Sequence, residues 1–269
     1  MKRFSSLTIF LILISFAMFQ SSSFATHKWG KYHWGRTSNP FTVKLGDNLA
    51  SGWKSYLNTA SSDWTQSSVL NTSIVAGGTN SSCNPTAGRD EVCNGSYGST
   101  GWLGVAQIWL YDHRGHISQG TVKLNDSYSM NNAEKLHVVC QEVGHTFGLD
   151  HQSTTGASLN TCMDYYQNKS DTDTLSTHPN AHDYEELGII YGHTDSVNTS
   201  FMPAGAPEAW RTLKLDGPGQ WGKLVERSAD GRYETYELDF GNGFEVLTFV
   251  IWAGPSNFRI GVGGEQPQR

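Results

Sequence analysis

The sequence predicts an α+β fold, in which a twisted mixed β-sheet is combined with one long helix and followed by a small C-terminal antiparallel β extension. Three patterns lead to this prediction. Residues 104–111 and 116–125 show the alternation of side chains that is typical of β-strands. Residues 136–147 place apolar side chains at the spacing of one helical face. Alternation returns over residues 222–253, where glycine-containing turns separate the predicted strands.

The N-terminal residues 1–25 have the pattern of a signal peptide. Lys2 and Arg3 precede an apolar run at 7–19, and small residues stand at positions 23 and 25, just before the expected cleavage. The apolar run holds about 13 residues, fewer than the roughly 20 that a membrane-spanning helix needs. We therefore expect a secreted, extracellular protein with no membrane span, whose mature chain begins near Thr26.

The remaining segments follow along the mature chain. We expect a short strand at 41–45, a helix at 52–67, a long surface excursion over 71–97 and a last helix near 180–191. Residues 202–207 read as a linker, because proline, glycine and alanine dominate them. The predicted organisation is therefore one domain over 26–200, followed by a linker and a small β-rich extension over 201–269.

Composition excludes several classes of protein. Charged residues make up 16% of the 269 residues, the formal net charge is −6, and no cluster of lysine and arginine occurs. A nucleic-acid-binding protein would need a basic face, and a disordered chain would be less hydrophobic and more highly charged. The sequence therefore indicates a folded extracellular protein that binds no nucleic acid, and we expect a monomer.

Four cysteines are present, and an even number in an exported chain indicates two disulfides. Four cysteines allow three pairings. The most economical one joins Cys83 to Cys93 around a small loop and Cys140 to Cys162 between the long helix and a later loop. A zinc site made of cysteines is the competing interpretation, but the sequence contains no pair of cysteines with C-x-x-C spacing.

The long helix, which begins near Asn131 or Asn132, carries the residues with chemistry. Gln141 and His145 lie four residues apart, so both can face one metal ion from the same side of the helix. Gly148 lets the chain reverse, and His151 can then supply a third ligand. Three protein ligands leave one position for water, as in a catalytic zinc site, where the pKa of the water falls to roughly 7. The adjacent Glu142 would accept the proton of that water as general base.

This pattern resembles the metzincin clan of zinc endopeptidases, and within it the matrixin-like proteins, whose signature is H-E-x-x-H-x-x-G-x-x-H. Glu142, His145, Gly148 and His151 match that signature. The resemblance implies a metzincin-like domain, a Zn²⁺ cofactor and an extracellular protein or peptide as substrate. It also implies that an extended substrate adds to an edge strand above the helix, for which the strand at 104–111 or the one at 116–124 would serve.

The resemblance also assigns residues that follow the motif. Met163, twelve residues after His151, would be the methionine of the Met-turn, which forms a floor beneath the metal. Tyr165, two residues later, would approach the zinc or steady the oxyanion, as a tyrosine does in some metzincins. Calcium is a second candidate cofactor, at Asp171 and Asp173 in an oxygen-rich loop, for which a solvated loop is the alternative.

One position departs from the signature, because Gln141 replaces the first histidine. A glutamine offers a neutral carbonyl oxygen, so zinc affinity should be lower. His137 cannot replace the lost ligand, because it lies about 12 Å along the helix axis from His145. Either Gln141 binds zinc through Oε1, or the site is degenerate.

The leading hypothesis is a secreted zinc endopeptidase that uses a zinc-bound water activated by Glu142. The alternative is a weakened or inactive metzincin scaffold that serves as an extracellular binding or structural module.

The other histidines are assigned structural roles. We interpret His113 and His116 as polar residues of an exposed loop; a second, structural zinc is the alternative, but its remaining ligands are not evident from the sequence. The residues expected to pack against the sheet are His27 and His33. Those expected at the surface or in helix caps are His178, His182 and His193.

Overall fold

A computed structural model describes residues 26–79, 82–153, 155–199 and 201–254. The expected signal peptide lies outside the described residues. Within the described ranges, no helix is long and apolar enough to cross a membrane.

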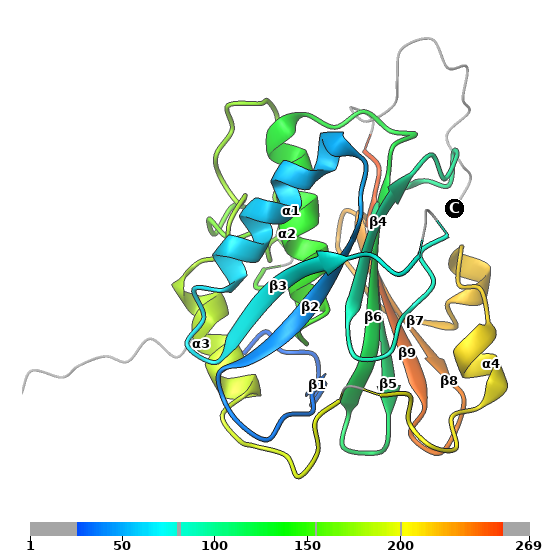
Figure 1. Ribbon diagram of the computed structural model, residues 1–269. Coiled ribbons are helices and arrows are strands. Elements are labelled where there is room, and N and C mark those ends of the chain that lie inside the picture. The colour runs from blue at the N-terminus through cyan, green and yellow to red at the C-terminus, as the bar shows by residue number, and fades with distance from the viewer. Residues whose placement is uncertain (1–25, 80–81, 154, 200, 255–269) are drawn as a thin grey trace, which may run out of the picture.

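The described residues form one mixed sheet with a few helices, so the α+β prediction is confirmed (Figure 1). The strands are β1 His33–Trp34, β2 Phe41–Asn48, β3 Leu70–Ala76, β4 Asp90–Gly95, β5 Trp102–Tyr111, β6 His116–Asn125, β7 Lys223–Arg227, β8 Tyr233–Asp239 and β9 Glu245–Trp252. The helices are α1 Ser51–Trp64, α2 Asn132–His145, α3 Ala181–Ile190, α4 Glu208–Thr212 and the short 3₁₀ helix η1 Pro218–Gln220.

The strand order is β3-β2-β4-β6-β5-β9-β8-β7, and β1 pairs with β6 outside this path. Strands β1, β2, β3, β4 and β6 pair in parallel. From β6 through β5, β9 and β8 to β7 every pairing is antiparallel. Helix α1 joins the parallel neighbours β2 and β3, whereas short turns join the antiparallel neighbours β5 and β6, β7 and β8, and β8 and β9.

The prediction of a surface excursion over 71–97 was wrong, because this segment contains most of β3 and all of β4. Strand β4 lies inside the sheet between β2 and β6. Its first two residues are acidic and fully buried, which hid the strand in the sequence. Both carboxylates have partners inside the protein: Thr146 Oγ1 donates to Asp90 Oδ2 at 2.8 Å, and Arg89 Nε pairs with Glu91 Oε1 at 2.7 Å. Glycine and asparagine are concentrated in the loop between the two strands, as the sequence suggested.

Both faces of the sheet are covered. In Figure 1, α1, α2 and α3 lie on one side of the sheet and α4 lies on the other. Two separate apolar clusters match this arrangement. Neighbouring residues of β5 point into different clusters, because side chains alternate along a strand: Ile108 belongs to the cluster under α2, and Trp109 to the cluster under α4. The second cluster is rich in tryptophan, with Trp210 of α4 almost fully buried.

The C-terminal extension is antiparallel, as predicted, but it joins the main sheet. Strand β9 pairs with β5 along almost its whole length, from Trp252 opposite Trp102 to Glu245 opposite Leu110. The sequence contained no sign of this pairing. The division at residues 200 and 201 stays a prediction, and the extension shares its sheet and both apolar clusters with the part of the chain before it.

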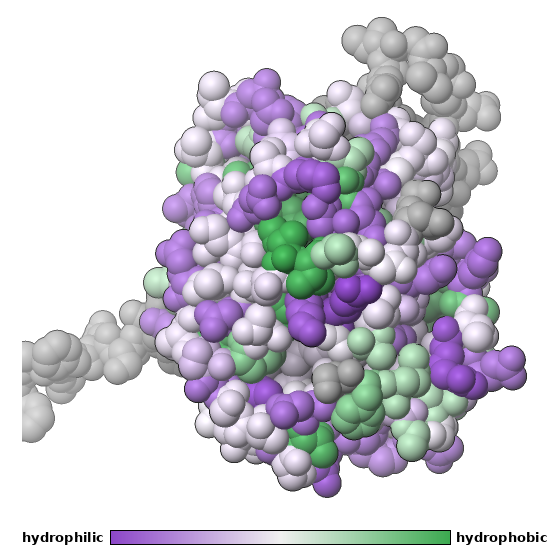
Figure 2. Space-filling model, in the orientation of Figure 1, coloured by the Kyte–Doolittle hydropathy of each residue, from purple (hydrophilic) through white to green (hydrophobic). Residues whose placement is uncertain are grey.

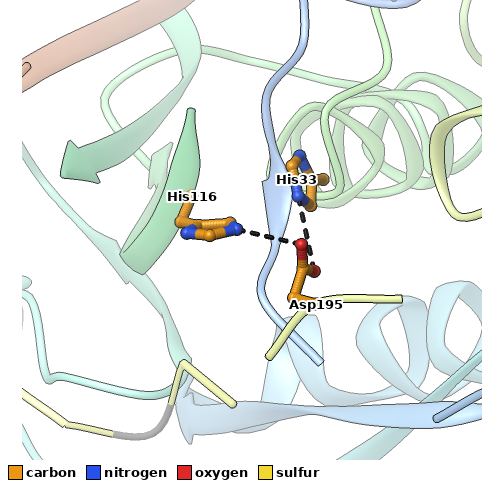
Figure 3. A group of neighbouring side chains, drawn as sticks. All are labelled: His33, His116 and Asp195. Atoms are coloured by element: carbon orange, nitrogen blue, oxygen red, sulfur yellow. Dashed lines mark hydrogen bonds and ion pairs between the residues drawn. The ribbon is translucent and has the colours of Figure 1, made fainter. Parts of the chain in front are cut away.

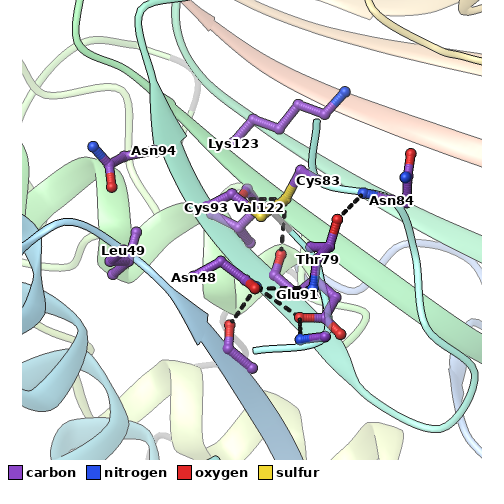
Figure 4. Close-up of a disulfide and its surroundings, with 12 residues drawn as sticks. Asn48, Leu49, Thr79, Cys83, Asn84, Glu91, Cys93, Asn94, Val122 and Lys123 are labelled. Atoms are coloured by element: carbon purple, nitrogen blue, oxygen red, sulfur yellow. Dashed lines mark hydrogen bonds between the residues drawn. A yellow bond between two sulfur atoms is a disulfide. The ribbon is translucent and has the colours of Figure 1, made fainter. Parts of the chain in front are cut away.

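Both predicted disulfides are present, Cys83–Cys93 and Cys140–Cys162. Figure 4 shows the first of them beside β4. The segment that it fastens is also held by hydrogen bonds: the Thr79 N–H donates to Asn48 Oδ1 at 3.1 Å, and the Asn84 N–H donates to Thr79 Oγ1 at 3.1 Å. The second disulfide ties the middle of α2 to the loop that carries Met163.

The face of the molecule in Figure 2 is mixed in character. Hydrophilic residues dominate it, and hydrophobic residues form separate areas between them. The most exposed large apolar side chains among the described residues, Ile189 and Phe201, come from segments far apart in the sequence.

Candidate metal centre

Helix α2 holds the predicted site residues against the sheet. The Asn131 side chain caps its first turn by accepting a hydrogen bond from the Glu134 N–H at 2.9 Å, which confirms one of the two predicted caps. The helix packs against β5, β6 and β9. Gly104 of β5 makes this approach close: a Cβ there would lie 2.7 Å from Glu142 Oε1 and 2.7 Å from Val138 Cγ1.

His145 and His151 lie together, as the sequence predicts. Gly148 adopts φ +88° just after α2 and turns the chain back. The two Nε2 atoms are then 3.1 Å apart. Burial and the neighbouring His151 lower the pKa of His145 to about 3, and burial, with His27, lowers that of His151 to about 3. Both rings are therefore neutral, which is the protonation state that a metal ligand needs.

The His145 ring has a defined tautomer. Its Nδ1 lies 2.9 Å from the Leu149 carbonyl oxygen, which can only accept a hydrogen bond. The proton of the neutral ring is therefore on Nδ1, and the lone pair of Nε2 is free to bind a metal.

The side-chain amide of Gln141 is fixed by hydrogen bonds through its nitrogen, whereas its oxygen has no hydrogen-bond partner. Its Nε2 donates to the main-chain oxygens of Cys162, at 2.8 Å, and Asp164, at 2.9 Å. Because both partners are acceptors, the amide nitrogen must face them and Oε1 must lie on the other side. Oε1 is buried and accepts no hydrogen bond. A buried acceptor without a donor costs about 1–3 kcal/mol, which a bound cation would recover.

Glu142 is completely buried beside this group. Neither carboxylate oxygen accepts a well-formed hydrogen bond. Burial raises the pKa of Glu142 well above its usual range, and the nearby Ala106 N–H offsets part of that rise. A carboxylate in these surroundings can exchange a proton with whatever lies next to it.

The two residues after the motif also lie close to it. Met163 is fully buried, and its Sδ would lie 2.6 Å from a Cβ at Gly144, so the sulfur packs directly on α2 next to His145. The Tyr165 ring lies 4.4 Å from the His151 ring, centroid to centroid. Burial raises the pKa of Tyr165, so its hydroxyl keeps its proton and can donate.

The C-terminal extension covers the two histidines. Phe249 of β9 stacks on His145, with centroids 4.3 Å apart and ring planes 6° apart. Tyr233 of β8 stacks on Tyr165 at 4.0 Å and lies 5.4 Å from the His151 ring. Sequence analysis missed both aromatic residues, since nothing in the local pattern connects β8 or β9 with α2.

The expectation of a free edge strand was wrong for both candidate strands. Strand β6 has β4 and β5 as neighbours, and β5 has β6 and β9. Strand β9 thus occupies the side of β5 to which an extended peptide could otherwise add.

No protein-family model matches the sequence, and no curated protein matches it either. Two solved structures are similar at 12% identity. "Structure of myroilysin" has a TM-score of 0.35 and covers 62% of this chain and 99% of its own. "Crystal structure of myroilysin" has a TM-score of 0.34 and covers 64% of this chain and 94% of its own. TM-scores this low do not establish a common fold, so the site has to be judged on its own geometry.

The interpretation of His116 as part of an exposed loop was wrong. His116 is the first residue of β6 and is fully buried, whereas His113 is exposed as expected. His116 forms a group with His33 and Asp195, and the ligand atoms of the three lie within 4.8 Å of one another (Figure 3). The three residues are far apart in the sequence, so no spacing pattern could reveal them.

Three other residues named in the sequence analysis are His137, Asp171 and Asp173. His137 is buried on α2, where burial and Arg232 lower its pKa to about 3. The oxygens of Asp171 and Asp173 accept hydrogen bonds, from the Asn132 N–H at 2.6 Å and from the Lys169 N–H at 3.0 Å respectively. The calcium site stays a prediction.

Proposed function

We propose that this protein is a secreted zinc-dependent endopeptidase of the metzincin type, with zinc held by Gln141, His145 and His151. One observation carries the proposal: the His145 and His151 Nε2 atoms lie 3.1 Å apart, and both the Gln141 Oε1 atom and the Glu142 carboxylate oxygens are buried without a hydrogen-bond partner. The resemblance of residues 141–151 to the metzincin signature supports the same function.

The donor set fits zinc. Ligand atoms about 2.0–2.1 Å from a tetrahedral zinc lie about 3.3–3.4 Å apart, and the two Nε2 atoms are 3.1 Å apart. An amide oxygen from Gln141 is a weaker third ligand that zinc accepts. Three protein ligands leave a fourth position open.

The residues of the chain would divide the chemistry as follows. Bound zinc would acidify a water molecule and polarise the carbonyl of the substrate. Glu142 takes the proton from the attacking water and passes it to the nitrogen of the leaving amine. The Tyr165 hydroxyl donates to the oxygen that gains negative charge at the reacting carbon. Met163 supports the histidines from below through its packing on α2.

We further propose that the described state is a covered, latent state. A substrate that pairs with β5 has to displace β9, because β9 pairs with the same side of β5. Phe249 would leave His145 in that step. The extension over residues 201–269 therefore controls access to the site.

The proposal is tested by metal analysis and an activity assay on the mature protein. We expect zinc to copurify, casein or gelatin to be digested at a low rate, and a zinc chelator to stop the digestion. Zinc added back in slight excess should restore it. Digestion that persists in metal-free protein would show that the hydrolysis does not use this site.

The burial of the site favours one other function, a binding or structural module on a peptidase scaffold. Glu142 is 0% exposed and His145 is 1% exposed, so the described state admits no substrate. If the protein binds zinc but digests nothing even when its extension is loosened, this second function is the correct one.

Trp210→Ala is expected to loosen the extension and raise activity. Trp210 anchors α4 on the far face of the sheet, where its Nε1 donates to the Glu245 carbonyl at the start of β9, at 3.1 Å. Removing a buried tryptophan costs about 3–5 kcal/mol. We expect the free energy of unfolding, measured in urea, to fall by about that amount, and casein hydrolysis at 25 °C to rise severalfold.

Trp53→Ala is the matched control, because Trp53 is also buried but packs α1 in the other apolar cluster. It should lower stability to a similar degree without raising activity. Equal activation by both variants would attribute the effect to general destabilisation rather than to the extension.

A further inference from the structure

A second group of ligand atoms lies at the end of the sheet where β1 pairs with β6. His33 and His116 are register partners in this pairing, so their side chains leave neighbouring strands at the same level. Asp195 approaches them from the loop after α3 (Figure 3). His33 and His116 are buried, and the Asp195 side chain is 8% exposed.

A fourth ligand atom comes from the same loop. His193 Nε2 lies 3.2 Å from His33 Nε2 and 3.6 Å from Asp195 Oδ1. His116 Nε2 lies 3.1 Å from Asp195 Oδ1. These separations are close to the roughly 3.3–3.4 Å between ligand atoms around a tetrahedral zinc.

The Nδ1 atoms of His33 and His116, which face away from the centre of the group, already have hydrogen-bond partners. His33 Nδ1 lies 2.6 Å from the Lys31 carbonyl oxygen, and His116 Nδ1 lies 2.9 Å from Asp112 Oδ2. Both partners are acceptors, so each Nδ1 carries a proton, and each Nε2 faces the centre of the group. A carboxylate or carbonyl behind a histidine is the usual outer support of a metal ligand.

The centre of the group suits a cation. His116 Nε2 and a carboxylate oxygen of Asp195 face each other at 3.1 Å, so a positive charge, either a proton on Nε2 or a metal ion, lies between them. Arg36 does not provide this charge. Its Nη1 donates to Asp195 Oδ2 at 2.8 Å and thereby fixes the carboxylate, with Oδ1 facing His116 and His193 and Oδ2 lying 3.5 Å from His33 Nε2.

We propose that His33, His116 and His193, through Nε2, and Asp195, through Oδ1, bind a structural Zn²⁺. A set of three imidazoles and one carboxylate suits zinc, for which the exposed His193 side chain would complete the His33–His116–Asp195 group, and four protein ligands leave no open position for catalysis. The ion joins the N-terminal segment, the start of β6 and the loop after α3. This proposal does not depend on the proposed peptidase activity, and none of its ligands belongs to the Gln141 site.

The site can be loaded and emptied from solution. A cavity of about 380 Å³ is lined by His33, His193 and Asp195, among other residues, and opens to the surface. The His193 side chain is 51% exposed. A chelator or a zinc buffer should therefore reach equilibrium with this ion without unfolding of the protein.

The experiment is a zinc-binding measurement on the mature protein, in buffers of fixed free zinc, with His193→Ala as the variant. We expect the variant to lose about one equivalent of zinc, or to bind that equivalent at least tenfold more weakly. His178→Ala is the matched control, because the His178 side chain is also 51% exposed and also pairs with an aspartate, Asp63. The control should bind zinc as the natural chain does.

Two further variants separate this site from the Gln141 site. His145→Ala should lose the other zinc and keep this one, and adding Asp195→Asn to it should remove what remains. In His145→Ala, zinc should also raise the melting temperature, because binding stabilises the folded state. Zinc binding that is unchanged in both His193→Ala and Asp195→Asn would overturn the proposal, whether or not the protein proves to be a peptidase.

Discussion

Replacement of Glu142 by glutamine is expected to lower the rate of peptide hydrolysis by about 10²–10⁴-fold and to leave zinc binding unchanged. Glutamine has the same shape as glutamate but cannot accept a proton. Glu142 would act on the attacking water and not as a zinc ligand, so the metal should remain. The measurement is kcat/KM on a peptide substrate, in the Trp210→Ala background where the site is open, together with zinc content.

Glu186→Gln is the matched control. Glu186 lies on α3, is also buried, and also has two carboxylate oxygens without a hydrogen-bond donor. The control should keep its activity, because this carboxylate belongs to neither metal group. If Glu142→Gln retained full activity, Glu142 could not be the general base, and the proposed mechanism would fail even with zinc present.

Features that depend on neighbours in the sequence were predicted well. Helix α2 begins at its asparagine cap, the chain turns at Gly148, and His151 returns to within contact of His145. Each of these follows from helical periodicity or from the backbone freedom of one glycine. The two disulfides were also predicted, since the shortest loops gave the correct pairing.

Features that depend on distant contacts were not predicted. Strand β4 begins with two buried acidic residues, and their burial is stabilised by hydrogen bonds that Thr146 and Asn48 donate from other segments. Likewise, the environment of His116 is decided by Asp195, 79 residues further along the chain. No local pattern contains such a partner, so His116 resembled a surface residue.

The position of the extension is the most consequential of these distant contacts. Strand β9 reads as an ordinary alternating strand, and its sequence does not say which strand it pairs with. Its pairing with β5 closes the free edge and brings Phe249 onto His145. In the proposed function, access of a substrate to the site therefore depends on how readily β9 leaves β5, and Trp210→Ala tests this directly.

Gln141→His is expected to tighten zinc binding at the Gln141 site by at least about tenfold, because zinc prefers an imidazole nitrogen to a neutral amide oxygen. The structure favours a fit. The glutamine amide presents a donor to one side and an acceptor to the other, and a neutral imidazole does the same with its two nitrogens. One ring nitrogen can donate to the Cys162 or the Asp164 carbonyl while the other binds zinc.

The substitution also has a cost. Gln141 Nε2 donates two hydrogen bonds, and a neutral histidine can donate only one, so one main-chain carbonyl loses its donor at about 1 kcal/mol. We expect slightly lower stability without metal and higher stability with zinc, measured by thermal unfolding at fixed free zinc. Gln141→Ala should abolish binding at this site. If Gln141→Ala and Gln141→His both bound zinc as the natural chain does, Gln141 would not be a ligand. The natural chain could lack peptidase activity even when Trp210→Ala loosens its extension, and Gln141→His could then gain that activity. In that case Gln141, rather than the covering strand β9, would keep the natural protein inactive.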